Sequence, residues 1–596
     1  MTPTDIAHPD YFHKVVDCQW ACPAHTPVPE YIRRISAGDY TGAYLINWKS
    51  NVFPGILGRT CDRPCEPACR RGRVEEEPVA ICRLKRVAAD FKGDVTGLMP
   101  GPAASRNGRR IACIGGGPAS LTVARDLAPL GYDVVVFDQD PKAGGMMRSQ
   151  IPKFRLPDSV IDEEVGYVMA TGVTFRGGQR IDSLKSVLAE GFDAVFVGTG
   201  APRGRDLDLP GRREAAANIH VGIDWLASVS FGHVDTIGRR VIVLGGGNTA
   251  MDCCRSSRRL GGAEVTVVVR SGFEEMKASP WEKEDAMHEG IPILNYRVPK
   301  AFTHENGRLT GMIFEKVKAD YDDKGRRQLV PTGEPDEHIA CDDVLIAVGQ
   351  ENAFPWIEQD AGIRFDRWGL PVVDPKTFQS SLPNVFFGGD AALGPKNIIW
   401  AVAHGHEAAI SIDAFCRGAD VAVRPPPTVT LISQKMGIHE WSYDNAIAND
   451  LRFKVPTLDN AIALKDIRTE VELGFDGKLG YAEAQRCLNC DVQTVFEPKL
   501  CIECDACVDI CPMDCITFTG DGPEEDLRGR LNAPAENREQ AIYLSGGLKT
   551  GRVMVKDEDV CLHCGFCAER CPTGAWDMQK SIIDTIHAGH ACQSRA

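Results

Sequence analysis

The sequence predicts an α/β protein in which one βαβ-containing domain is inserted in another, with a cysteine-rich region on either side. Two glycine-rich turns, at 115–120 and 245–250, each follow an apolar strand and open a helix. A short apolar strand at 384–390 returns after the second turn. Cysteines concentrate before residue 105 and after residue 486.

The length of 596 residues suggests three to five domains, at about 100–200 residues per domain. We place the boundaries by composition. We expect a mostly helical domain in 1–105, an outer α/β domain in 106–201 and 351–425, an inserted α/β domain in 202–350, a linker with possible metal ligands in 426–490, and a small α+β domain in 491–596.

Charge and hydropathy limit the partners. The net charge of −15 argues against binding to nucleic acid or to an anionic membrane surface. The start, MTPTDIAHPD, has neither the basic nor the apolar part of a signal peptide, and no apolar run approaches the roughly 18 residues of a membrane span. We therefore expect a cytoplasmic protein. In that reducing compartment, the 23 cysteines indicate metal ligands rather than disulfides.

The first glycine-rich turn has the pattern of a dinucleotide site. It follows a strand at 110–114 and opens a helix that runs to about residue 129, and the next strand, 133–137, ends at an acid. Glycines let the backbone approach a pyrophosphate, and the acid can bind ribose hydroxyls. The alternative is a chance glycine turn in an α/β core. The expected cofactor contacts are Gly115, Gly117, Pro118, Ala119, Ser120 and Asp138.

The second glycine-rich turn repeats the pattern after a strand at 240–244. The strand that follows its helix, 264–269, is succeeded by an arginine, Arg270, instead of an acid. An arginine at that place suits the 2′-phosphate of NADP(H), whereas an acid would favour NAD. The alternative for the arginine is a solvated charge at a strand end. The expected contacts are Gly245, Gly247, Asn248, Thr249 and Arg270.

The returning strand ends in Gly388-Gly389-Asp390, and a helix-like run from 397 to about 415 follows. Two nucleotide folds with such a returning strand predict nested Rossmann-like domains. The NAD(P) domain would be inserted in an outer domain that holds FAD. Gly389 and Asp390 are then further cofactor contacts.

Several segments together carry a family resemblance. They are Gly-Gly-Met-Met at 144–147 with Ile-Pro at 151–152, and the segments 194–200, 245–252, 343–349 and 387–390. Residues 10–425 resemble the small subunit of bacterial glutamate synthase and the matching part of dihydropyrimidine dehydrogenase. The resemblance implies FAD at the first site and NADPH at the second, and it adds Gly144, Gly145, Gly200 and Gly349 to the cofactor contacts. The family usually has two arginines where this chain has Arg270-Ser271, a departure that weakens the NADP(H) assignment.

Near the C-terminus, the run C-x₂-C-x₂-C-x₃-C-P occurs twice. At this spacing, three thiolates hold one [4Fe–4S] cluster and the fourth ligates the other. One cluster would take Cys501, Cys504, Cys507 and Cys571, and the other Cys561, Cys564, Cys567 and Cys511. Zinc is the alternative, but it does not call for this crossed arrangement. The region resembles a bacterial two-cluster ferredoxin with a long insert at 519–556.

The N-terminal cysteines are interpreted through the resemblance, which implies a helical domain with two [4Fe–4S] clusters. The family's Arg-Cys-x-x-Cys pair before Cys18 is missing, but Arg486-Cys487-Leu-Asn-Cys490 occurs far downstream. Our hypothesis is that this pair is supplied from there, and that Cys82 replaces a ligand that the family spacing puts at Lys85, one helical turn away. The groups would be Cys18, Cys69, Cys487 and Cys490, and Cys22, Cys61, Cys65 and Cys82. The alternative is a single N-terminal cluster.

These sites predict an electron-transfer enzyme. A nicotinamide exchanges two electrons as hydride, whereas clusters take one at a time, and a flavin does both. We expect an NAD(P)H:ferredoxin-type oxidoreductase with FAD, NADP (or NAD) and four [4Fe–4S] clusters, and with no catalytic acid or base. Its partner would be ferredoxin or another oxidoreductase subunit, in a hetero-oligomer such as a 2-oxoacid oxidoreductase. The alternatives are a glutamate synthase small subunit and a non-enzymatic electron wire or scaffold.

Overall fold

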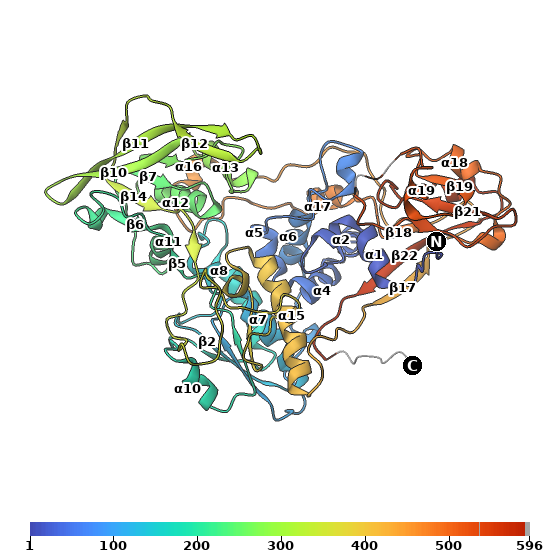
Figure 1. The fold of residues 1–596 in the computed structure, drawn as a ribbon, viewed down its shortest axis with the longest axis horizontal. Coiled ribbons are helices and arrows are strands. Elements are labelled where there is room, and N and C mark those ends of the chain that lie inside the picture. Colours follow the sequence, from blue (N-terminus) through green and yellow to red (C-terminus); the bar gives the residue numbers. More distant parts are fainter. Residues whose placement is uncertain (534, 536, 590–596) are drawn as a thin grey trace. The chain divides into compact units, whose positions relative to one another are not determined.

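The computed structural model describes residues 1–533, 535 and 537–589 (Figure 1). It divides into two compact units. The cysteine-rich unit comprises Met1–Leu98, Val423–Val455 and Gly474–Ala596, and the α/β unit comprises Met99–Ala422 and Pro456–Leu473. Each unit therefore contains segments that are far apart in the sequence.

The outer domain of the α/β unit is built on a five-stranded sheet in the order β16-β4-β1-β2-β3. All of its strand pairs are parallel. The central strands are short runs of valine, isoleucine and alanine that are buried on both faces, as parallel sheets require. The strands are β1 (Arg110–Ile114), β2 (Asp133–Phe137), β3 (Thr174–Arg176), β4 (Ala194–Val197) and β16 (Val385–Phe387).

A second parallel sheet, in the order β6-β14-β7-β8-β9, forms the inserted domain. Because β4 precedes it and β16 returns to pair with β4, the insertion predicted from the sequence is confirmed. The paired strands β5 and β15 belong to the two passages between the domains. The bounds are β5 (Arg203–Gly204), β6 (Ile219–Val221), β7 (Arg240–Leu244), β8 (Glu264–Val268), β9 (Ile293–Leu294), β14 (Asp343–Ile346) and β15 (Gln350–Glu351).

An antiparallel sheet is added to the inserted domain. Its long strand β11 (Arg308–Tyr321) pairs with β10 (Arg297–Glu305), β12 (Arg327–Pro331) and β13 (Glu337–Ala340). Phe302, Met312 and Phe314 of this sheet are buried against the parallel sheet, in one cluster with Ile242 and Val344. The first residue of β12 lies near the carboxyl end of β8, at the second nucleotide site described below.

Helices cover both parallel sheets. The glycine turns open α7 (Pro118–Leu127) and α12 (Asn248–Arg259), and α7 packs on α15 (Ile398–Cys416), all within two residues of the expected bounds. The others are α8 (Met146–Ser149), α9 (Asp158–Met169), α10 (Leu184–Ala189), α11 (Gly222–Ser230), α13 (Pro280–His288), α14 (Asp390–Leu393) and α16 (Asn460–Ala463), with 3₁₀ turns η3 (Ala128–Leu130) and η4 (Ala216–Asn218). Helix α16 lies beside α13 (Figure 1), where Asn460 donates to the His288 carbonyl.

The N-terminal part of the cysteine-rich unit is helical. Helices α3, α4, α5 and α6 pack on one another, and α17 packs on α3 and α6 although it is some 400 residues further along the chain. The bounds are α1 (Pro9–Val15), α2 (Asp17–Ala21), α3 (Val28–Ser36), α4 (Tyr40–Asn51), α5 (Pro54–Thr60), α6 (Ile81–Phe91) and α17 (Gly477–Ala484), with η1 (Arg70–Arg73) and η2 (Thr96–Leu98).

The C-terminal part holds two three-stranded antiparallel sheets, β17-β22-β18 and β19-β21-β20. Helix α1 packs on β22, so that Tyr11 and Phe12 share a core with Phe496 and Trp576. The bounds are β17 (Thr428–Ser433), β18 (Val492–Phe496), β19 (Ile516–Gly520), β20 (Tyr543–Leu544), β21 (Arg552–Lys556), β22 (Trp576–Asp584), α18 (Ala506–Asp509), α19 (Glu524–Arg528), α20 (Phe566–Arg570) and η5 (Pro498–Leu500).

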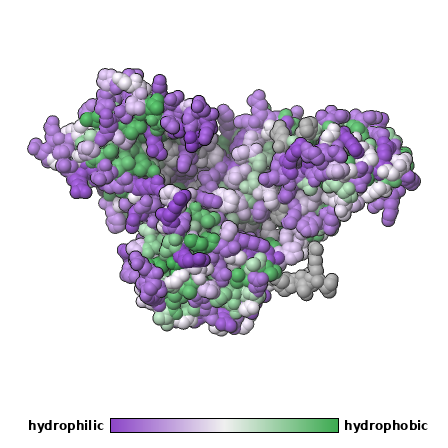
Figure 2. Space-filling view, viewed as in Figure 1, coloured by the Kyte–Doolittle hydropathy of each residue, from purple (hydrophilic) through white to green (hydrophobic). Residues whose placement is uncertain are grey.

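Among the described helices, none combines the length and the apolar character that crossing a bilayer requires. Figure 2 shows hydrophilic residues spread over the visible face of both units.

A buried ion cluster ties α12 to α13 and allows a test of the inserted domain. Glu289 accepts hydrogen bonds from Arg255 (2.9 Å) and Arg259 (2.7 Å), and all three side chains are at most 3% exposed. Glu289→Ala would leave two buried guanidinium groups without this carboxylate, and we expect it to lower the free energy of unfolding by about 3–5 kcal/mol. Urea unfolding measures this loss, and Glu284→Ala, on the exposed face of α13, is the control. Equal midpoints for the two variants would contradict the assignment.

Candidate cofactor sites

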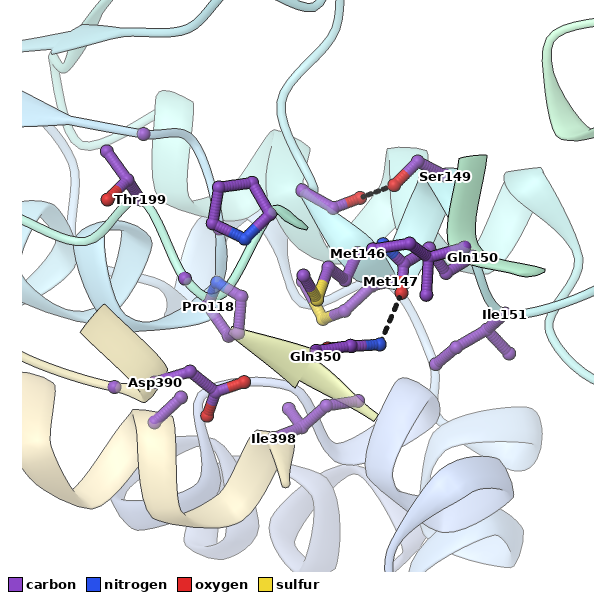
Figure 3. A pocket seen from close by; sticks show the side chains of 18 of the residues that line it. Pro118, Met146, Met147, Ser149, Gln150, Ile151, Thr199, Gln350, Asp390 and Ile398 are labelled. Atoms are coloured by element: carbon purple, nitrogen blue, oxygen red, sulfur yellow. Dashed lines mark hydrogen bonds between the residues drawn. The ribbon is translucent and has the colours of Figure 1, made fainter. Parts of the chain in front are cut away.

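The first glycine turn opens onto a cavity of about 370 Å³ that residues of the outer and the inserted domain line together (Figure 3). The outer domain contributes residues of α7, α8, α14 and α15 and of the turns after β1, β2, β4 and β16, and the inserted domain contributes residues of α11 and α12. Of the predicted contacts, nine line this cavity: Gly115, Gly117, Pro118, Ala119, Asp138, Gly145, Gly200, Gly389 and Asp390. Asn248 and Thr249, which we predicted at the second site, also border it.

Two predicted residues lie behind the cavity wall. Ser120 is fully buried under Gly198, whose added Cβ would come within 2.3 Å of the Ser120 hydroxyl oxygen. Gly144 donates its amide to the Gly116 carbonyl (2.8 Å) and has a φ of +136°. Both residues therefore shape the turn rather than face the cavity.

The glycines of the first turn serve two different purposes. Gly115 has a φ of +96°, and a Cβ there would lie 2.6 Å from the Gly198 carbonyl oxygen, so the fold itself requires glycine. Gly117 has an ordinary φ of −82°, and a Cβ there would approach only one protein atom, at 3.9 Å. Since neither the backbone nor the neighbours require glycine at 117, close approach of a ligand explains it.

Polar groups in the cavity suit a dinucleotide. No side chain caps the N-terminus of α7, so its first amides remain available to a pyrophosphate. Asp138, at the end of β2, accepts a hydrogen bond from the Gly116 amide, and burial raises its pKa. The buried Thr199 hydroxyl has no hydrogen-bond partner among the described residues and borders the cavity (Figure 3). These residues fit FAD.

A second cavity of about 670 Å³ lies at the second glycine turn. It is lined by five predicted contacts: Gly245, Gly247, Thr249, Arg270 and Gly349. Gly247 corresponds to Gly117 of the first turn, and here too the protein itself does not require glycine. Its φ is −104°, and no protein atom lies within 4 Å of an added Cβ. The N-terminus of α12 has no side-chain cap. The two nucleotide sites thus repeat one design.

Bases outnumber acids in the lining of the second cavity. Arg270 is accompanied by Arg205, Lys277, Arg297 and Arg327, against two carboxylates, Asp206 and Glu275. Arg327 pairs with Glu275 at 2.5 Å, and this hydrogen bond lowers the pKa of that carboxyl group. Sequence reasoning missed Lys277, Arg297 and Arg327. Arg297 and Arg327 arrive from the added antiparallel sheet, and Lys277 lies in the segment between β8 and α13. They supply positive charge where the family's second arginine is replaced by Ser271.

Four cysteines that are distant in the sequence line one cavity in the cysteine-rich unit: Cys18, Cys69, Cys487 and Cys490. We call them the shared group. Apolar residues of α3 and α6, including Ile32 and Ile81, complete the wall, together with Asp17 and Arg70. Burial raises the pKa of Cys18, and the nearby cysteines raise it further. This is the donor set and the enclosure that an iron–sulfur cluster fits.

The remaining N-terminal cysteines gather around α6. Cys82 is buried beside the thiols of Cys61 and Cys65, and we call these three with Cys22 the α6 group. Lys85 is also buried there. Burial opposes its charge, but the surrounding cysteines, Cys82 first among them, raise its pKa. The Lys85 ammonium donates to Asn51 Oδ1 at 2.6 Å. The position where the family spacing puts a ligand thus holds a cation.

The C-terminal cysteines fall into the two crossed sets. Cys511, Cys561, Cys564 and Cys567 line one cavity, and we call them the inner group. Burial raises the pKa of Cys501 and of Cys507, and nearby Cys571 raises both further. With Cys504, these cysteines make up what we call the outer group. Cys504 and Cys564 are exposed, whereas the other ligands are buried or half-buried.

A fifth cysteine, Cys515, also lines the cavity of the inner group. Its sulfur lies 3.5 Å from that of Cys511, and this contact lowers the pKa of Cys511 to about 6. The position follows the cysteine run by four residues, where the second run has Ala575.

Comparison with known proteins follows the same division. The profile of the pyridine nucleotide-disulphide oxidoreductases matches residues 109–405. The profile of domain II of dihydropyrimidine dehydrogenase, a 4Fe-4S cluster domain, matches 12–95, and that of the 4Fe-4S dicluster domain matches 500–575. The NADP(+)-dependent formate dehydrogenase subunit beta of Moorella thermoacetica is 36% identical over 79% of this chain and 70% of its own length. The chain belongs to the pyridine nucleotide-disulphide oxidoreductase family.

Two further proteins are similar to this chain over long stretches. The NADPH-Fe(3+) oxidoreductase subunit beta of Geobacter sulfurreducens is 29% identical over 82% of this chain and 77% of its own length. The glutamate synthase [NADPH] small chain of Azospirillum brasilense is 31% identical over 68% of this chain and 88% of its own length. The predicted resemblance is confirmed, and the protein is an NAD(P)H-dependent flavin and iron–sulfur oxidoreductase.

The free position at Gly117 gives a prediction about FAD. Gly117→Ala adds a methyl group that meets no protein atom closer than 3.9 Å, so we expect a folded protein. That methyl group would point at the pyrophosphate, and we expect FAD affinity to fall about tenfold or more, or about 1.4 kcal/mol. Flavin fluorescence on titration of the apoprotein measures the affinity. The control is Gly166→Ala in α9, where a Cβ meets nothing within 4 Å; equal affinities would contradict the site.

Arg270 gives a prediction about the nicotinamide cofactor. Arg270→Asp would replace a cation by an anion beside the 2′-phosphate, and a charge-assisted hydrogen bond is worth about 1.5–3 kcal/mol. We expect KM for NADPH to rise about tenfold or more and KM for NADH to change little. Steady-state reduction of a dye measures both constants. Arg239→Asp, at an exposed arginine before β7, is the control, and an unchanged NADPH preference would overturn the assignment.

Proposed function

We propose that the protein transfers electrons between NADPH and a one-electron acceptor through FAD and four [4Fe–4S] clusters, as the electron-transfer subunit of a larger complex. One observation carries the proposal. A single chain gathers two dinucleotide cavities and four groups of four cysteines, one of them assembled from both ends of the sequence. Such an arrangement is useful where electron pairs have to be separated into single electrons.

The chain's own residues bind and orient. In the first cavity, the α7 amides and Gly117 receive the pyrophosphate, and Asp138 and Thr199 offer partners to hydroxyl groups. In the second, Gly247 and the α12 amides do the same for NADPH. When bound, FAD supplies the exchange between hydride and single-electron chemistry.

NADPH is favoured over NADH by the basic lining of the second cavity. Four basic side chains, Arg205, Lys277, Arg297 and Arg327, accompany Arg270 there. They outnumber the carboxylates of Asp206 and Glu275, and a dianionic 2′-phosphate gains from such a surplus of positive charge. The relatives whose names mention NADP or NADPH support the same choice.

A larger complex is supported by the relatives, several of which are named as subunits. Exposed Cys504 and Cys564 leave one corner of each C-terminal group near the surface, where an acceptor protein would exchange electrons. None of the described cysteines forms a disulfide, and this suits a reducing compartment such as the cytoplasm.

Glutamate synthase small-subunit activity is the second candidate, supported by the Azospirillum relative. That relative aligns with only 68% of this chain, whereas a dicluster domain matches residues 500–575. The C-terminal domain therefore favours transfer to a one-electron acceptor. Glutamate formation with a glutamate synthase large subunit would favour the second candidate instead.

The test is anaerobic reduction of the purified, reconstituted protein. NADPH should bleach the yellow flavin absorbance, and a one-electron dye should then be reduced catalytically. The Gly117→Ala variant should bind less FAD, and it should therefore lose both the flavin bleaching and the dye reduction. A flavin that NADPH does not bleach would refute the proposal.

Iron content tests the four groups. Four clusters predict about sixteen irons per chain, and a fully loaded anaerobic preparation with fewer than about fourteen would contradict the count. The double variant Cys487→Ser/Cys490→Ser should lose about four irons and keep its FAD, because it removes two ligands of the shared group only. Cys416→Ser, outside all four groups, is the control. Unchanged iron in the double variant would show that the shared group holds no cluster.

A further inference from the structure

The shared group and the inner group are joined by a buried histidine. His563 lies two residues after Cys561 and is 1% exposed. Its ring nitrogen Nδ1 lies 2.7 Å from the carbonyl oxygen of Cys490, which belongs to the shared group. Because a carbonyl can only accept, Nδ1 carries the hydrogen and donates it. The backbone amide of His563 donates to the sulfur of Cys561, at 3.3 Å.

A second side chain makes the reverse connection. Arg70 follows Cys69 of the shared group, lines that group's cavity, and donates to the carbonyl oxygen of Cys561. It also donates to Asp17 at 2.5 Å and lies 3.3 Å from His563 Nε2. Arg70, next to a cysteine of the shared group, thus binds the backbone of Cys561 in the inner group, and His563, next to the inner group, binds the backbone of Cys490 in the shared group. The two groups are thereby held in one fixed relation.

The rest of the histidine's surroundings fix its ring. His563 Nε2 lies 3.0 Å from a carboxylate oxygen of Glu558. Glu558 also accepts from Lys556 (2.8 Å) and from the Tyr11 hydroxyl (2.8 Å), and all of these contacts are buried. The ring is therefore held from both sides, with little freedom to turn away from Cys490.

The equivalent residue in the first cysteine run shows that the cluster fold does not by itself require this histidine. Glu503 also lies two residues after the first cysteine of its run, has nearly the same positive φ (+57° against +55°) and donates its amide to Cys501 Sγ at 3.3 Å. Its side chain bonds to Thr550 and Arg552 instead of reaching another cysteine group. The backbone feature is common to both runs, whereas the bridge is specific to position 563.

We propose that His563 is the electron bridge between the shared group and the inner group. The route runs from the Cys490 backbone through the Nδ1 hydrogen bond to the imidazole, and from the His563 amide to the Cys561 sulfur, so only two of its links are not covalent. Electronic coupling falls less steeply through bonds and hydrogen bonds than through space. Each electron that crosses oxidises the shared cluster by one and reduces the inner cluster by one, with NADPH as the source through FAD. No proton crosses, because the Cys490 carbonyl cannot take one.

The inference rests on the proposed function and deepens it, since it names the residue through which the N-terminal and C-terminal clusters communicate. His563→Phe keeps a ring of similar size but removes the Nδ1 donor. His563→Asn restores an amide donor at about the same separation from Cα as Nδ1. Glu503→Ala is the matched control in the first run. His563→Met, a flexible apolar side chain, serves if His563→Phe does not load its iron.

The experiment is rapid anaerobic mixing of the full-length, iron-loaded protein with NADPH. Flavin absorbance is followed by stopped flow, and reduced clusters by freeze-quench electron paramagnetic resonance. We expect unchanged iron content and flavin bleaching in His563→Phe, and inner-cluster reduction slowed about tenfold or more, equivalent to about 1.4 kcal/mol of barrier. His563→Asn should recover most of the rate, and Glu503→Ala should match the wild type.

The possible results separate the two proposals. A wild-type flavin that NADPH does not bleach refutes the proposed function, and the bridge falls with it. Normal bleaching with equal cluster reduction in His563→Phe and the wild type refutes the bridge alone. Equal slowing in His563→Phe and His563→Asn also refutes it, because the histidine would then act only by packing. The bridge is supported if inner-cluster reduction is slow in His563→Phe and recovers in His563→Asn.

Discussion

The attachment of residues 486–491 to the N-terminal helices is the constraint on which the cysteine-rich unit depends. Arg486 is fully buried and donates to Glu483 (2.8 Å) and to the carbonyls of Glu77 (2.9 Å) and Asp450 (2.8 Å). On the other side of the two cysteines, Asp491 receives a bidentate contact from Arg33 of α3, at 2.7 and 2.5 Å. Cys487 and Cys490 thus lie between two buried arginine contacts, each of which joins this segment to the N-terminal domain.

The consequences extend to the ferredoxin-like domain. Strand β18 begins at Val492, directly after Asp491, and pairs with β22, so the anchor that brings Cys487 and Cys490 to the shared group also fixes the first strand of that domain. Helix α1, at the start of the chain, also packs on β22. The inner group is therefore positioned next to the shared group by covalent continuity as well as by His563 and Arg70. A separate ferredoxin that docks and dissociates would lack the first of these constraints.

The sequence predicted features that depend on local spacing and missed those that depend on distant packing. The glycine turns and the paired cysteine runs are local patterns, because strand, turn and helix follow one another and a cluster needs ligands at fixed intervals. The grouping of Cys487 with Cys18 was inferable only because a ligand pair expected near the N-terminus was missing. Arg327 carries no local signal, since it reaches the second cavity from an added sheet that folds back to β8, and Lys277 lies in an irregular segment between β8 and α13. Likewise, residues 456–473 belong to the α/β unit because Leu458, Ala463 and Val471 pack on Phe154, which composition did not indicate.

Buried charge gives the cysteine groups different surroundings. Four thiolates in a low-dielectric interior need compensation, and three groups have a buried cation close by: Lys85 in the α6 group, Arg70 at the shared group and Lys556 near the inner group. At the outer group, burial raises the pKa of Cys501 and the hydrogen bond from the Glu503 amide lowers it, while Cys571 and the Glu503 carboxylate raise it. Because local charge and exposure set cluster potentials, a nearby cation favours the reduced state and a nearby carboxylate opposes it. The outer group lies beside an ion pair instead, between Glu503 and Arg552 at 3.0 Å, and it also has an exposed ligand position, Cys504.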